Sequence, residues 1–90
     1  MQKRAKEHFE GERALFQQKD LLLEECLFDN GESPLKEGKN LSCLRSTFDW
    51  KYPLWYGKNL KIEDCFFSSQ ARAGIWYSQD VTLSSCRYEA

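Results

Sequence analysis

The sequence predicts an all-β fold, a parallel β-helix solenoid, on two observations. First, four segments share one register: KDLLLEECLF (19–28), KNLSCLRSTF (39–48), KNLKIEDCFF (58–67) and QDVTLSSCRY (79–88). Second, apolar residues recur inside each segment with a period of two, as they do in half-buried strands. The polar turn residues Asp20, Asn40, Asn59 and Asp80 are 20, 19 and 21 residues apart. A near-constant period of this length is typical of a solenoid in which each repeat forms one coil.

Each coil can be justified element by element from its aligned columns. Asp and Asn recur at the turn because they tolerate left-handed backbone. Inward-facing columns then follow in chain order: Leu21/Leu23, Leu41/Cys43, Leu60/Ile62 and Val81/Leu83; Cys26, Ser46, Cys65 and Cys86; Phe28, Phe48, Phe67 and Tyr88; and, five residues before each turn, Leu15, Leu35, Leu54 and Ile75. We therefore expect about four coils of 19 to 21 residues, with three short strands in each coil and like residues stacked in ladders.

Two other repeats of similar length fit less well. A leucine-rich repeat would need LxxLxLxxN spacing, whereas the second half of each coil holds β-branched, aromatic or cysteine residues. A four-sided pentapeptide coil would show small and leucine-like residues every five positions, which GESPLKEG does not. Residues 11–90 are expected to form one β-helix domain. Residues 1–10 fall outside the register and are expected to be an amino-terminal cap, in a short helix or irregular structure, or a disordered tail.

Composition restricts the classes of partner. The net charge is −1, with 13 basic and 14 acidic residues mixed along the chain, which argues against nucleic acid. The sequence has no run of 18 apolar residues and no apolar stretch after the charged start, so we expect no membrane partner and a cytoplasmic location. Phosphate-loop and nucleophile-elbow patterns are missing, and we expect no cofactor.

The four cysteines follow the spacing of the coil. They form no CxxC pair, and His8 is the only histidine, so we expect no metal site. Stacking would bring Cys65 and Cys86 near the distance range of a disulfide, but a cytoplasmic chain would keep them reduced. A buried ladder of free thiols that pack as small hydrophobes is the preferred interpretation.

Four strings carry a resemblance to a known family: GERALF (11–16), GESPLK (31–36), WKYPLWY (50–56) and ARAGIWY (71–77). They resemble an uncharacterised bacterial domain-of-unknown-function family of right-handed parallel β-helix proteins in the pectin-lyase-like superfamily. The similarity runs from about Gly11 to Ala90 and covers only the family's amino-terminal part. It implies a short right-handed parallel β-helix and no assigned activity. The link to enzymes that cleave polysaccharides is an analogy of fold.

Two columns of charged residues are candidate sites. Asp29 and Asp49 follow Phe28 and Phe48, and stacking would place them roughly 5 Å apart, close to the separation of a retaining glycosidase pair. Asp29 also begins the turn-like string DNGES, so a solvated turn aspartate is the alternative. The second column holds Glu12, Glu32, Lys51 and Arg72. Lys51 and Arg72 could bind an anionic sugar, or the column could be a solvated or cross-paired ladder.

Aromatic residues form the third candidate site. Trp55 and Trp76 share a column, and Tyr56 and Tyr77 follow them. An outward strip of these side chains would suit sugar rings or a protein partner. The alternative is that the turn folds some of them inward as a corner plug.

These features favour a non-catalytic assembly or binding module of otherwise unknown function. We expect a homo-oligomer, most simply a dimer, because the last coil leaves unpaired strands over exposed core. Its interface would contain Val81, Leu83, Cys86 and Tyr88. The alternative function is a carbohydrate-binding or carbohydrate-cleaving module that uses Asp29 and Asp49 beside the aromatic strip.

Overall fold

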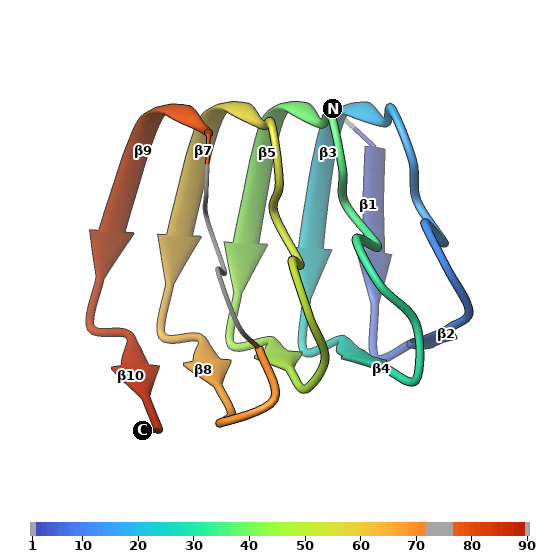
Figure 1. Cartoon of the computed structure of the whole chain (residues 1–90). Helices are drawn as coiled ribbons and strands as arrows, with labels where there is room; N and C mark the ends of the chain where they lie inside the picture. Colours follow the sequence, from blue (N-terminus) through green and yellow to red (C-terminus); the bar gives the residue numbers. More distant parts are fainter. Residues whose placement is uncertain (1, 72–76, 90) are drawn as a thin grey trace.

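The chain folds as a β-solenoid in which successive coils lie side by side along one axis (Figure 1). The computed structural model describes residues 2–71 and 77–89. Two parallel five-stranded sheets run through this part of the chain, and no helix occurs among the described residues. The predicted all-β solenoid with a repeat of about 20 residues is therefore confirmed.

The longer strands form the first sheet, in which each strand pairs with the equivalent strand of the next coil. Its order is β1 (Gln2–Ala5), β3 (Lys19–Glu24), β5 (Lys39–Leu44), β7 (Lys58–Glu63) and β9 (Gln79–Ser84). Leu21 pairs with Leu41 and Leu41 with Leu60, as the aligned columns predicted. These leucines are buried because alternate strand residues point to opposite faces.

The second sheet carries a ladder of stacked aromatic rings. Its strands are β2 (His8–Glu10), β4 (Leu27–Asp29), β6 (Thr47–Phe48), β8 (Phe66–Phe67) and β10 (Arg87–Tyr88). Consecutive rings of Phe9, Phe28, Phe48, Phe67 and Tyr88 lie 4.5 to 5.1 Å apart between centroids. The predicted aromatic column is correct, and Phe9 adds one more member to it.

In the coils whose third side the structure describes, before β3, β5 and β7, this side is built from turns, so the prediction of three strands per coil was wrong there. The third inward column is nevertheless buried, at Leu15, Leu35 and Leu54, while Ile75 lies outside the described residues. The amide of Leu15 donates to the carbonyl of Pro34 in the next coil, and the amide of Leu35 donates to that of Pro53. Left-handed residues such as Arg13 and Gln17 interrupt the extended backbone here, which prevents a continuous strand.

Residues 2–10 follow the register of the repeats, contrary to our expectation. Strand β1 pairs with β3 so that Arg4 lies opposite Leu23, and β2 pairs with β4 so that Phe9 lies opposite Phe28. The segment adds one more layer of strands, visible at the blue end of the ribbon in Figure 1. Its side chains are mostly exposed and polar, which suits an outer layer.

Candidate functional site

A column of lysines stands at the start of three neighbouring strands. Lys19, Lys39 and Lys58 open β3, β5 and β7, and the sheet register places each beside the next. Adjacent strands are roughly 4.8 Å apart, so three positive charges follow one another along the coil axis. All three side chains are exposed, and no ion pair neutralises them in the described part of the chain. Stacked like charges without counterions favour an anionic ligand.

Two exposed tyrosines stack beside the lysine column. Tyr56 and Tyr77 occupy the corner two residues before the strands, and their ring centroids are 5.1 Å apart. They are 50% and 64% exposed. Both have left-handed backbone, as do Gln17 and Glu37 at the same corner of earlier coils. The corner therefore presents a different side chain in each coil while its backbone repeats.

Trp55 lies partly beneath this surface. Its ring centroid is 4.6 Å from that of Tyr52 and 5.7 Å from that of Tyr56, and Lys36 Nζ lies 5.7 Å from the Trp55 ring centroid. The side chain is half-buried, and its Nε1 is buried without a hydrogen-bond partner among the described residues. Trp55 thus forms the base of the aromatic cluster, and the tyrosines form its outer part. Trp76, its predicted companion, lies outside the described residues.

A shallow groove of about 610 Å³ extends between Lys19, Lys39 and Tyr56. It is lined by Gln17, Lys19, Lys36, Glu37, Lys39 and Tyr56. Gln17 Nε2 donates a hydrogen bond of 3.1 Å to Glu37 Oε1, which fixes two of these side chains across neighbouring coils. Groups that face the groove can form ion pairs, donate hydrogen bonds and stack on a flat ring. We call Lys19, Lys36, Lys39, Lys58, Tyr56 and Tyr77 the basic–aromatic face.

Sequence reasoning found the tyrosines of this face but missed its lysines. The signal was present, because Lys is the first residue in three of the four aligned segments, and Gln79 is the first in the fourth. The predicted basic pair does not contribute to the groove: Lys51 is half-buried elsewhere, and Arg72 lies outside the described residues. Lys51 also forms no ion pair with Glu32 within the described residues.

Asp29 ends β4 and Asp49 follows β6, the equivalent strand of the next coil, but each already has a polar partner. The amide of Asp49 donates to the carbonyl of Phe28, so the two aspartates belong to adjacent coils as predicted. Asp29 Oδ1 lies 2.5 Å from His8 Nε2, while the hydroxyl of Ser68 donates to Asp49 Oδ1. The hydrogen bond that His8 donates to the Asp29 carboxylate raises the pKa of His8. Neither aspartate lines the groove beside Tyr56.

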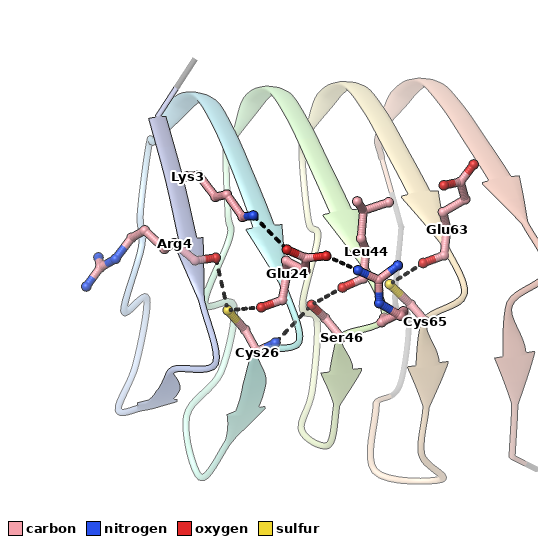
Figure 2. A network of polar contacts seen from close by, with 9 residues as sticks. Lys3, Arg4, Glu24, Cys26, Leu44, Ser46, Glu63 and Cys65 are labelled. Carbon is pink, nitrogen blue, oxygen red and sulfur yellow. Dashed lines mark hydrogen bonds and ion pairs between the residues drawn. The ribbon is translucent and has the colours of Figure 1, made fainter.

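The cysteine column lies at the bend between the two sheets, where its thiols meet backbone carbonyl groups (Figure 2). Cys26 Sγ lies 3.6 Å from the carbonyl oxygen of Arg4 in the preceding coil and 3.5 Å from that of Glu24. Ser46 replaces a thiol in this column, and its hydroxyl donates to the carbonyl of Leu44 at 3.1 Å. The column therefore requires a small hydrogen-bond donor, which explains why serine and cysteine interchange there.

All four cysteines are free thiols. Burial raises the pKa of Cys65 to about 11 and raises that of Cys43 well above its ordinary value. These two groups stay protonated near neutral pH and are poor nucleophiles. Cys86 is partly exposed, so the expectation that all four are buried was wrong for that residue.

An ion-pair network crosses the coils on the outer face of the same bend. Glu24 Oε1 lies 2.8 Å from Lys3 Nζ, and Glu24 Oε2 pairs with Arg45 in the next coil. Figure 2 shows the carboxylate of Glu24 with Lys3 of the preceding layer beside it. The network links three successive coils.

The residues of the predicted oligomer interface lie on the last strands of the two sheets. Leu83 on β9 is 42% exposed and Tyr88 on β10 is 54% exposed, while Val81 and Cys86 are half-buried. In the equivalent columns of the preceding coil, Leu60, Ile62 and Phe67 are almost completely buried. The exposure therefore follows from the position of the strands at the edge of both sheets.

No helix in the described part of the chain is long and apolar enough to cross a membrane. Comparison with curated proteins gives no match. Comparison with protein families gives a match over residues 2–90, nearly the whole chain, to a family described as "Protein of unknown function (DUF3737)". The match includes residues 2–10, in agreement with their place in the sheets. The chain therefore belongs to this family, whose description assigns no function.

Proposed function

We propose that this chain is a non-catalytic binding module whose basic–aromatic face binds an anionic carbohydrate polymer. The observation that carries the proposal is a column of three lysines that forms no ion pair among the described residues and stands beside two exposed, stacked tyrosines. Lys19, Lys39 and Tyr56 of this face line one groove. Tyrosine rings offer a flat apolar surface with a polar edge, which suits the apolar face and hydroxyl groups of a sugar. Lysines supply the charge that an acidic sugar requires.

The coil repeat supports a polymer as the ligand. Lys19, Lys39 and Lys58 present equivalent groups at a regular interval, because each coil repeats the backbone of the previous one. A chain of acidic sugars also presents equivalent groups at regular intervals. Several weak contacts made together give useful affinity when the array is rigid. We also propose that the chain belongs to the pectin-lyase-like superfamily. The parallel pairing of its coils is consistent with this assignment.

The absence of catalysis is also part of the proposal. Asp29 and Asp49 do not line the groove, and their carboxylates contact His8 and Ser68. An acid pair that cleaved a polymer bound at Tyr56 would have to contact the same polymer. A binding role needs no such placement.

Affinity measurements on the intact 90-residue protein test the proposal. We expect alginate, an acidic polysaccharide, to bind and a neutral glucan to bind at least tenfold more weakly, with alginate binding weakened by salt. Lys39→Ala and Tyr56→Ala should each reduce alginate affinity about tenfold or more. Lys61→Ala is the matched control, because Lys61 is an exposed lysine of β7 that does not line the groove. Equal losses in Lys39→Ala and Lys61→Ala, or no alginate binding, would reject the proposal.

A second candidate function is self-association through the β9–β10 edge. The specific observation is the exposure of Leu83 and Tyr88 on strands that are paired on one side only. Edge strands with apolar side chains recruit other strands. We propose a two-fold dimer of this protein, because that symmetry uses the same edge on both copies and closes the assembly.

Sedimentation velocity tests the dimer. We expect a dimer at micromolar concentration and a monomer for Leu83→Glu. Thr82→Glu is the control, because Thr82 is the preceding residue of β9 and points to the opposite face. A wild-type monomer throughout this range would overturn the proposed dimer. Circular dichroism of Leu83→Glu distinguishes dissociation from unfolding.

A further inference from the structure

A histidine and two carboxylates converge on the outer face of the second sheet, away from the basic–aromatic face. Strand register places Glu10 of β2 directly beside Asp29 of β4. His8 is two residues before Glu10 on the same strand, so both side chains point to the same side. Phe9 lies between them and points inward, where it stacks on Phe28 at 5.1 Å. Because Phe9 faces the core, His8 and Glu10 lie on the outward face of β2.

The distances within this group suit a metal ion. His8 Nε2 lies 2.5 Å from Asp29 Oδ1, and His8 Nδ1 lies 3.7 Å from Glu10 Oε1. One ligand atom from each residue can be chosen so that all three lie within 4.8 Å of one another. Tetrahedral zinc with bonds of about 2.1 Å places its ligand atoms roughly 3.4 Å apart. Small rotations of these side chains would separate His8 from Asp29 and bring Glu10 closer.

Charge favours a cation at the same point. Among the described residues, neither Glu10 nor Asp29 forms an ion pair with lysine or arginine, and the basic side chain beside both is His8. Two carboxylates and one neutral imidazole balance the charge of a divalent ion. The next residue in the column, Asp49, is held by Ser68 but adds to the negative potential.

We infer that His8, Glu10 and Asp29 form a binding site for a divalent transition-metal ion of the zinc class. The imidazole selects zinc over magnesium and calcium, which prefer oxygen ligands alone. Three protein ligands leave a fourth position for water. Because the ion would join β2 to β4, its binding also stabilises the pairing of the first layer with the second.

Titration calorimetry with Zn²⁺ on the intact protein tests the inference. The Cys86→Ser variant serves as the reference, because its partly exposed thiol is an alternative zinc ligand. We expect one ion per chain, a higher melting temperature with zinc, and at least tenfold weaker binding of Mg²⁺. In this background His8→Ala and Asp29→Asn should each weaken zinc binding tenfold or more. Asp64→Asn, which changes an exposed aspartate outside the cluster, should leave it unchanged.

Three outcomes would overturn the inference: no zinc binding to the Cys86→Ser protein, equal affinity for Zn²⁺ and Mg²⁺, or full binding by both site variants. Absorption of the Co²⁺-substituted protein gives an independent readout. Nitrogen and oxygen ligands give ligand-field bands without the intense charge-transfer band of thiolate ligation, whose appearance would assign the ion to cysteine instead. Asp29→Asn preserves the size of the side chain, so it remains informative if His8→Ala disturbs β2.

Discussion

Replacement of Phe48 by alanine should remove a large part of the stability of this protein. Phe48 is 0% exposed, and its ring lies between those of Phe28 and Phe67 at centroid distances of 5.0 and 4.9 Å. A buried Phe→Ala change costs about 3–5 kcal/mol. Each stacked pair is worth about 0.5–1.5 kcal/mol beyond its buried area, and two pairs are lost, so we expect the upper part of that range.

Urea unfolding followed by tryptophan fluorescence measures this loss, as a lower midpoint with an unchanged slope. Phe66→Ala is a matched control, because Phe66 is the residue before Phe67 on β8, faces outward and is only half-buried. We expect the control to cost about 1 kcal/mol or less.

A loss below about 1 kcal/mol for Phe48→Ala, or equal losses in the two variants, would refute the assigned inward face. The total stability expected for a small domain is roughly 5–15 kcal/mol, so Phe48→Ala could fail to fold. Phe48→Leu retains most of the volume and should cost about 1.5 kcal/mol or less, which keeps the test measurable.

Three further predictions concern the thiols and a glycine. Thiol labelling of the native protein should be slowest at Cys43 and fastest at partly exposed Cys86; equal rates would contradict the assigned burial. Because burial raises the pKa of Cys65 to about 11, its thiol stays protonated when the unfolded chain ionises. Its contribution to stability is therefore present below about pH 9 and should be lost as pH rises through 11; if Cys65→Ser leaves this decline unchanged, the thiol is not its cause. Gly38→Ala should destabilise the protein, because the added Cβ would lie 2.3 Å from Leu41 Cδ1; an unchanged melting temperature would show that Leu41 moves aside.

The coil could be predicted from sequence because each inward column recurs in successive coils. A single phenylalanine is ambiguous, but Phe28, Phe48 and Phe67 at one repeat position have a single consistent placement, and the structure confirms it. The amino-terminal layer could not be predicted in this way. QKRA of β1 lacks the apolar pair of the other coils, since an outer strand need not bury its side chains, and Phe9 alone continues a column.

The backbone conformation of the third side and of the groove could not be predicted from the residue types. Residues with positive φ at its corners include Arg13, Glu37 and Tyr56, which carry none of the usual signals of a left-handed turn. These corners break the extended backbone into turns and bring Lys36 to the Tyr56 ring, with Nζ 6.0 Å from its centroid. The lysine column could be identified from the aligned segments. Its proximity to the aromatic residues could not, because it depends on the bend of the backbone between them.

The pairing of each strand with the equivalent strand of the next coil also determines how the chain can fold. Every ladder contact between β3 and β5, or between β5 and β7, closes a loop of about 20 residues. No ladder contact joins β1 to β9, so folding does not require the closure of a long loop, which would cost conformational entropy. Folding can start at any adjacent pair of coils and extend in both directions, one coil at a time. Hydrogen exchange should accordingly be slowest in β5, at the middle of the stack, and faster toward β1 and β9.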